Sequence, residues 1–190
     1  MKSIRTISCL LLFLSISLCL SAQKAAMKTN LLYDATTTAN IGIEIGFSSN
    51  WTLDVSGNIN AWTYSDDKKW KHWLVQPEAR YWFCERFNGH FIGLHVLGGE
   101  YNIGNVRLPF GVYPATKGNR FEGWGVGGGL SYGYQWILSR HWSIEGAVGL
   151  GYIYSKYKKY PCDVCGDLLN EGSKNYFGPT KLALSVIYVF

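Results

Sequence analysis

The sequence predicts an all-β fold, an eight-stranded antiparallel up-and-down transmembrane β-barrel, from three observations. Hydrophobic and polar residues alternate with a period of two along much of the chain, which is typical of strands whose two faces meet different surroundings. The alternating segments are long enough to cross a bilayer as tilted strands. The connections between them are alternately short and long, as in bacterial outer-membrane barrels.

Residues 1–22 are predicted to be a cleaved signal peptide, which leaves residues 23–190 as the barrel domain. Lys2 and Arg5 give a basic start, residues 7–20 are almost wholly apolar, and Ser21-Ala22-Gln23 offers small residues for cleavage. Cys19 could instead carry a lipid, but Leu18 stands where a small residue is expected before a lipidated cysteine.

Composition narrows the class of protein further. The net charge falls from +5 to +3 on cleavage, because Lys2 and Arg5 leave, and such a mildly basic chain gives no indication of nucleic-acid binding. No apolar run of about 18 residues remains, so no helix is expected to span a bilayer. Because lipid offers no partner to unpaired backbone groups, a membrane protein without such helices must be a closed barrel.

Eight strands are expected, and their length favours a membrane. The alternation is clearest between Trp51 and Trp62, with Leu53 and Val55 on one face and Asp54 on the other. Strands of soluble domains are usually about 5–6 residues long, whereas these reach about 9–15, enough to cross a hydrocarbon core. The expected strands are 27–35, 40–48, 51–63, 72–83, 90–101, 122–136, 142–155 and 179–190.

The connections give the barrel an orientation. If the chain starts in the periplasm, the outward connections are generally long and the periplasmic ones are short turns, which is the usual asymmetry. The first outward connection, 36–39, is the tight exception. Aromatic residues near both strand ends would form two interfacial girdles. The long outward connections are 64–71, 102–121 and 156–178.

The last strand carries an assembly signal by resemblance. Leu182, Leu184 and Val186 alternate with other residues up to Tyr188 and Phe190, and Phe190 is the final residue. This resembles the C-terminal signature that the barrel-assembly machinery reads in outer-membrane proteins. The resemblance implies that Tyr188 and Phe190 form the signal, that this machinery is a partner during biogenesis, and that the protein lies in the cell outer membrane.

Parity along the strands places six charged side chains inside the barrel. Charges taken out of bulk water need partners, so we expect a paired network in the lumen, joined by His95. The alternative is a general acid–base pair or a proton path. A polar lumen is normal for this architecture, which favours the structural network. The six residues are Glu44, Asp54, Glu78, Arg80, Glu145 and Lys181.

The cysteines of the mature chain suggest a local disulfide and do not suggest a zinc site. Cys162 and Cys165 are expected to form a disulfide in an outer loop, because the compartment is oxidising. A redox pair is the alternative, and Asp163 argues against it because it would not lower a thiol pKa. With Cys84 the mature chain keeps too few cysteines for a four-cysteine zinc site, and we predict no cofactor.

One motif tests an enzymatic interpretation. His141-Trp142-Ser143, followed by Glu145, is similar to the histidine, serine and carboxylate that outer-membrane lipid A deacylases use. However, His141 is expected at a periplasmic turn, away from the outer leaflet. We therefore favour a non-enzymatic protein, with a lipid-modifying enzyme as the alternative and a narrow pore as the third candidate.

Basic residues in the predicted outer loops could contact lipopolysaccharide phosphates by charge pairing. A solvated loop surface explains them equally well. They are Arg107, Lys117, Arg120, Lys156, Lys158 and Lys159.

Several segments resemble an uncharacterised family of small outer-membrane β-barrel proteins of Bacteroides-type, Gram-negative bacteria. They are Lys28-Thr29-Asn30-Leu31-Leu32-Tyr33, Asn40-Ile41-Gly42-Ile43-Glu44, Tyr81-Trp82-Phe83 and the glycine-rich sixth strand. Some members are encoded near fimbrial genes, so the resemblance adds a fimbrial or other surface protein to outer-membrane lipid and lipopolysaccharide as candidate partners. It transfers no functional residue. We expect a role in envelope integrity or surface interaction.

Overall fold

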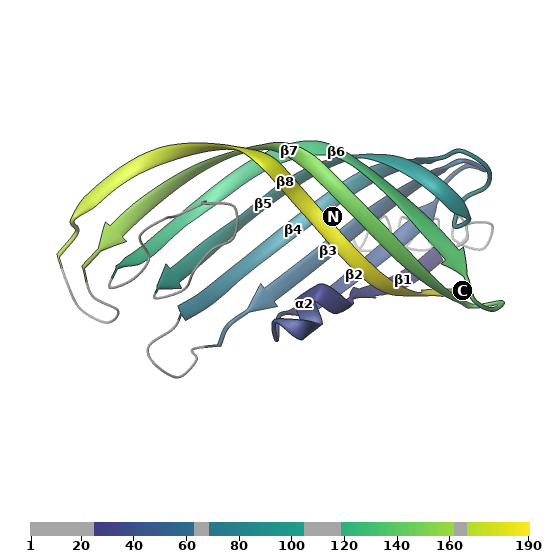
Figure 1. The fold of residues 1–190 in the computed structure, drawn as a ribbon, viewed down its shortest axis with the longest axis horizontal. Coiled ribbons are helices and arrows are strands. Elements are labelled where there is room, and N and C mark those ends of the chain that lie inside the picture. The colour runs from purple at the N-terminus through teal and green to yellow at the C-terminus, as the bar shows by residue number, and fades with distance from the viewer. Residues whose placement is uncertain (1–24, 63–68, 105–118, 162–166) are drawn as a thin grey trace, which may run out of the picture.

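The structure is a computed structural model that describes residues 25–62, 69–104, 119–161 and 167–190. Over these residues eight antiparallel strands close into a barrel, in which each strand pairs with its sequence neighbour and the last returns to the first (Figure 1). This confirms the predicted up-and-down ring. The elements are β1 (Ala25–Asn30), α2 (Leu31–Ala35), β2 (Ala39–Gly46), β3 (Trp51–Asn60), β4 (Lys69–Trp82), β5 (Gly89–Gly104), β6 (Arg120–Ile137), β7 (Trp142–Tyr160) and β8 (Asn170–Val189).

The expected strand 27–35 is wrong over its second half, where the chain forms the short helix α2. Asn30 explains the change, because its side-chain oxygen accepts a hydrogen bond from the Leu32 amide at 3.2 Å and so caps the helix. The same side chain also binds the backbone of β8, donating to the Leu182 carbonyl at 3.1 Å. The first outward connection is thereby fixed against the barrel wall.

The strands differ in length around the barrel. β1 has 6 residues and β2 has 8, whereas β7 has 19 and β8 has 20. The β7–β8 ladder continues out to the pair Lys159 and Asn170. In Figure 1 these long strands run beyond the ends of β1–β3 and curve over.

This extension corrects the placement of four predicted loop residues. Arg120 begins β6, and Lys156, Lys158 and Lys159 lie within β7, all in backbone-paired strands instead of outer loops. Lysine, asparagine and glycine have low strand propensity, so these segments read as loops in isolation. Cross-strand pairing gives their backbone groups partners and overrides that preference.

Two glycines mark a close approach between β6 and β7. A Cβ atom added to Gly129 would collide with the carbonyl oxygen of Leu150, and one added to Gly151 would collide with the carbonyl of Gly128. The two strands approach too closely here for any side chain at these positions.

The lumen is packed at the end where the C-terminus lies. Trp82, Phe91 and Ala147 form one buried cluster, and the Trp82 and Phe91 ring centroids are 4.8 Å apart. Ala26 and Ile187 belong to a second buried cluster beside it. These side chains close that end of the barrel.

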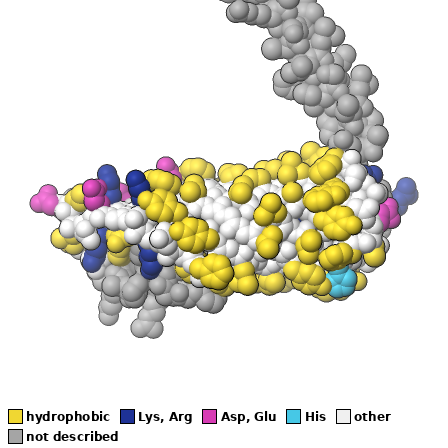
Figure 2. Space-filling view, turned by 90° about the horizontal axis from the view of Figure 1, so that it is seen from above, with side chains coloured by type: hydrophobic (Ala, Val, Ile, Leu, Met, Phe, Trp, Pro, Cys, Tyr) yellow, Lys and Arg dark blue, Asp and Glu magenta, His cyan; other side chains and the backbone are white. Residues whose placement is uncertain are grey.

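The outward face carries an apolar belt. Leu94 is 63% exposed and Leu130 is 68% exposed, and other leucine, valine and isoleucine side chains surround them. Figure 2 shows hydrophobic side chains along the middle of the wall and charged ones gathered toward its ends. No helix in the described part of the chain is long and apolar enough to span a membrane.

Candidate functional site

Two polar regions stand out along the barrel, one in the lumen and one on the outer face. The structure places all six predicted lumen residues close together. Arg80 of β4 lies at their centre and is fully buried. Its Nη1 donates to Glu44 at 2.8 Å and to Glu145 at 2.7 Å, and its Nη2 donates to Asp54 at 2.9 Å. Arg80 thus connects β4 to β2, β3 and β7 across the lumen.

Lys28 of β1 joins these residues, although it was not among those expected from the sequence. Its ammonium group pairs with Glu44 and lies 3.4 Å from Asp54 and 3.6 Å from Glu145. Lys28 falls on the same strand face as the buried Ala26, so the parity signal was present in the sequence. Together the seven residues form what we call the lumen charge cluster: Lys28, Glu44, Asp54, Glu78, Arg80, Glu145 and Lys181.

Hydroxyl groups of the surrounding wall also donate hydrogen bonds to the cluster. Lys181 of β8 pairs with Glu78, and the Ser131 hydroxyl donates to the same carboxylate. Thr52 donates to Glu44 at 2.5 Å. His95 lies opposite Glu78 in the β4–β5 register, with its Nε2 2.9 Å from the Thr180 hydroxyl. These carboxylates are engaged by cations and hydroxyls, so using one as a general base would first require breaking its ion pairs.

The structure does not bring His141, Ser143 and Glu145 into a triad. The His141 Nδ1 lies 2.9 Å from the Val189 carbonyl, and its ring stacks on Tyr188. Ser143 is buried on the inward face of β7. Glu145 accepts both of its hydrogen bonds from Arg80. His141 and Glu145 are therefore engaged with other residues, and neither is arranged to activate Ser143 as a nucleophile.

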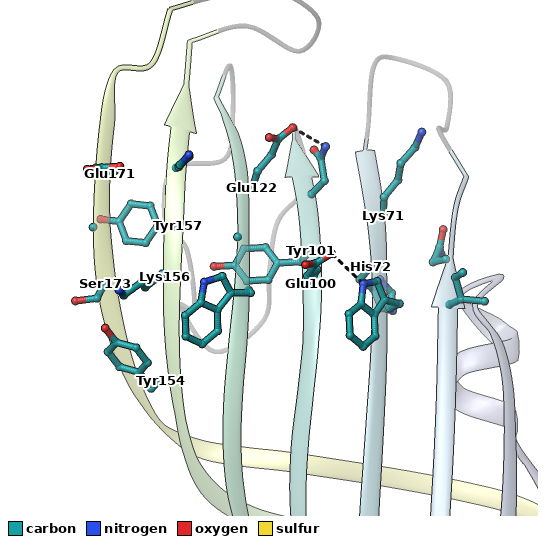
Figure 3. Close-up of a pocket in the computed structure, with 18 of the residues that line it drawn as sticks. Lys71, His72, Glu100, Tyr101, Glu122, Tyr154, Lys156, Tyr157, Glu171 and Ser173 are labelled. Carbon is teal, nitrogen blue, oxygen red and sulfur yellow. Dashed lines mark hydrogen bonds between the residues drawn. The ribbon is translucent and has the colours of Figure 1, made fainter. Parts of the chain in front are cut away.

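A second site crosses the ends of β3–β8 that lie away from the C-terminus, where a groove of about 970 Å³ runs over the sheet on the face turned away from the lumen (Figure 3). We call it the outer-face groove. Successive cross-strand partners from β4 to β8 form its upper row. Asn102 donates to Glu122 at 2.8 Å in this row, and Lys158 lies between Glu122 and Glu171. Charge therefore alternates along the row from Glu122 through Lys158 to Glu171. The row consists of Lys71, Asn102, Glu122, Lys158 and Glu171.

The next row toward the middle of the barrel mixes aromatic and charged side chains. The Trp73 indole donates to Glu100 at 3.1 Å, and the Trp124 ring lies 6.1 Å from that of Tyr154. One row further, the outward side chains include Val75 and Val126, and both are exposed. The groove thus lies where the outward face changes from apolar to charged. Its lower row is Trp73, Glu100, Trp124, Lys156 and Ser173.

The chemistry of this outer-face groove is balanced. Lys71, Lys156 and Lys158 supply positive charge, and the carboxylates of Glu100, Glu122 and Glu171 offset it. Lysine ammonium groups donate to phosphate oxygens, and carboxylates accept hydrogen bonds from hydroxyls. The groove therefore suits a partner that carries both kinds of group.

The remaining predicted residues lie apart. The Arg120 Nη2 is 3.1 Å from Glu122, and its guanidinium lies over the Tyr160 ring at 4.7 Å. Lys159 lies over the buried Phe121 ring at 5.9 Å. Cys84 is an exposed free thiol. Four predicted residues fall outside the described residues, namely Arg107, Lys117, Cys162 and Cys165.

At the C-terminus, the Tyr188 ring packs against Trp142 at 5.1 Å and against Phe190 at 5.2 Å. The Phe190 amide donates to the Ala25 carbonyl at 2.9 Å, so the end of the chain is tied to its first described strand. Among the described residues, no group of three or more histidine, cysteine or acidic side chains could hold a metal ion.

Comparison with known sequences gives one match. Residues 8–190 match a family described as a protein of unknown function, DUF3575. None of the curated proteins matches the chain. Because the family match includes all eight strands, the lumen charge cluster and the outer-face groove, the chain belongs to the DUF3575 family.

Proposed function

We propose that this protein is an outer-membrane β-barrel of a Gram-negative bacterium with a non-enzymatic role in envelope integrity or surface interaction. It acts through its outer face, which contacts lipopolysaccharide and, above it, a protein partner. The observation that carries this proposal is the order of side chains along the outward wall. An apolar belt gives way to aromatic residues and then to the charged row of the groove.

The belt supports a membrane location on energetic grounds. Monomeric soluble proteins rarely expose contiguous apolar patches beyond a few hundred Å², and exposed apolar area costs roughly 25 cal/mol per Å² in water. Lipid removes that cost. A closed ring of strands also leaves no unpaired edge in the hydrocarbon region. The predicted signal peptide fits export toward the outer membrane.

The filled lumen favours surface contacts over transport. The lumen charge cluster and the Trp82 aromatic cluster occupy consecutive levels of the barrel, so ions would have to pass the buried ion pairs and then the packed rings. The lipid-modifying alternative lacks a supporting arrangement, because His141 and Glu145 bind Val189 and Arg80 instead of Ser143. The outer end is therefore the part of the molecule best suited to function.

Lipopolysaccharide has the chemistry that the groove fits. Its headgroup region consists of phosphorylated sugars, which offer phosphates to Lys71, Lys156 and Lys158 and hydroxyls to the neighbouring carboxylates. Trp73 and Trp124 lie at the height where amphipathic rings favour a membrane interface. A fimbrial or other surface protein could contact the same outer end from above.

Cell fractionation tests the location. We expect the full chain in the outer-membrane fraction, and we expect unheated protein to migrate faster on SDS gels than boiled protein, as intact barrels do. Recovery from the soluble periplasm without a heat-dependent shift would overturn the proposal.

Partner binding is tested by reconstituting the protein in vesicles with and without lipopolysaccharide. Lipopolysaccharide should raise the thermal unfolding temperature of the wild type, and the double variant Lys156→Glu, Lys158→Glu should lose most of that gain. Arg140→Glu is the matched control, because Arg140 is exposed in the β6–β7 turn at the opposite end. Equal gains in all three proteins would remove lipopolysaccharide as the partner. Lipid A mass spectra from a deletion strain should show unchanged acylation, and a changed pattern would favour the enzyme.

A further inference from the structure

A separate cavity lies inside the barrel, on the opposite face of the same strands as the outer-face groove. We call it the inner cup. Its volume is about 380 Å³, within the range of about 300–1,000 Å³ usual for small-molecule sites. Lumens of membrane barrels are normally polar, yet most of the side chains here are apolar. They include Trp70, Leu74, Leu97, Ile103, Ile153 and Tyr176.

Strand register separates the inner cup from the lumen charge cluster. Leu97 follows His95 on the inward face of β5, so the cup begins one inward position beyond the level of Glu78 and His95. Tyr33 and Asn58 line both the cup and a small polar cavity next to the cluster. The cup therefore has a polar floor, which sets a limit to how far an apolar guest can enter.

The wall of the cup is uneven. Asn60, the last residue of β3, pairs with His72, so the level of Trp70 and Ile103 lies beyond the end of that strand. Among the described strands, the outermost level of the cup is thus walled by the long ones, β4–β8. The cup lies toward the outer end of the barrel, away from the packed end.

Among the described residues, Lys174 is the lysine or arginine that lines the cup. Lys174 of β8 is half-buried there, beside Ser155, whose hydroxyl donates to the Lys174 carbonyl at 3.2 Å. Glu100 also borders the cavity, but its carboxylate accepts from Trp73 on the outward face of the sheet. The side chains directed into the cup thus combine an apolar surface with a positive charge.

We propose that the inner cup binds a fatty acid, with the hydrocarbon chain in the cup and the carboxylate beside Lys174. A barrel of eight strands has room for one small ligand, which favours a single chain over a two-chain lipid. Burial of the chain supplies the affinity, and pairing of the carboxylate with the ammonium group sets its direction.

A glycine in the cup provides the test. A Cβ added to Gly125 would lie 3.5 Å from Ile153 Cγ2 and 3.6 Å from Ser155 Cβ, which is ordinary contact. Gly125→Phe should therefore fill the cup without displacing the backbone. Val126→Phe is the matched control, because Val126 is the next residue and is exposed on the outward face.

The measurement is saturable binding of radiolabelled palmitate to the full chain in phosphatidylcholine nanodiscs, since detergent would compete for the cup. We expect one site in the wild type above empty discs, at least tenfold weaker binding in Gly125→Phe, and unchanged binding in Val126→Phe. Lys174→Gln should weaken binding of palmitate several-fold and binding of hexadecanol much less.

Each variant is first shown to be folded by its heat-dependent gel mobility, and Ile153→Trp replaces Gly125→Phe if the latter fails to fold. Wild-type binding no greater than that of empty discs, or equal binding by the cup-filled variant, overturns the proposal. Lys156→Glu, Lys158→Glu should bind palmitate normally, so failure of the groove and failure of the cup can be told apart.

Discussion

The lumen charge cluster and the outer-face groove are built from the same lysine, arginine and acidic residue types, in opposite surroundings. In the cluster, Arg80 and Glu145 are fully buried and 2.7 Å apart. In the groove, Lys158 and Glu171 are cross-strand neighbours that both remain exposed. Breaking a buried pair leaves a charge without solvent, whereas water screens an exposed one. The cluster should therefore govern stability, and the groove should remain available for recognition.

The largest effect should come from the centre of the cluster. Arg80→Ala leaves Glu44, Asp54 and Glu145 without their main partner, and we expect a loss of about 3–5 kcal/mol in the free energy of unfolding. Urea unfolding of the vesicle-inserted protein measures it. Arg86→Ala is the control, since Arg86 binds turn carbonyls outside the cluster. Similar urea midpoints for Arg80→Ala and the wild type would contradict the inference that the cluster governs stability.

A smaller loss is expected at Lys28, the member that sequence analysis missed. Lys28→Met removes one partner from Glu44, which keeps Arg80, so we expect about 1.5–3 kcal/mol of destabilisation. The same unfolding assay applies, with the exposed Lys156→Met as its counterpart in the groove. If both methionine variants lose the same amount, burial does not separate the two sites.

The smallest effect should be the coupling between Lys158 and Glu171. A double-mutant cycle of Lys158→Ala and Glu171→Ala should give about 0.2–1 kcal/mol of interaction free energy. Repeating the cycle at 1 M salt should remove that coupling, because exposed charges are screened. The loss in Arg80→Ala should persist at the same salt concentration. A coupling as large as the buried losses would mean that the groove is a structural element.

The sequence alone was sufficient to predict most members of the lumen charge cluster, because alternate positions along a single strand point inward. Glu44, Asp54 and Glu78 each follow a clear period of two. Lys28 obeys the same rule, but its strand is short, ends at a helix cap, and offers few residues from which to read a period.

The groove and the inner cup were not predictable in the same way. Beyond Trp73 and Trp124 the outward face becomes polar, so Lys156-Tyr157-Lys158 loses the apolar and polar alternation that identifies a strand. Its role depends on register with Glu122 and Glu171, which lie on other strands. Likewise the cup collects residues from β4, β5, β7 and β8, and no single segment reveals them.

The unequal strand lengths make the two sides of the barrel differ in height. A tall rim over β6–β8 faces one way, and a low rim at β1–β3 faces the other. If the protein lies in the outer membrane, as proposed, a molecule that diffuses in the outer leaflet would meet the tall rim on the first side and the low rim on the second. A neighbouring protein that binds to the tall rim would therefore fix the rotational orientation of the barrel and leave the low rim uncovered.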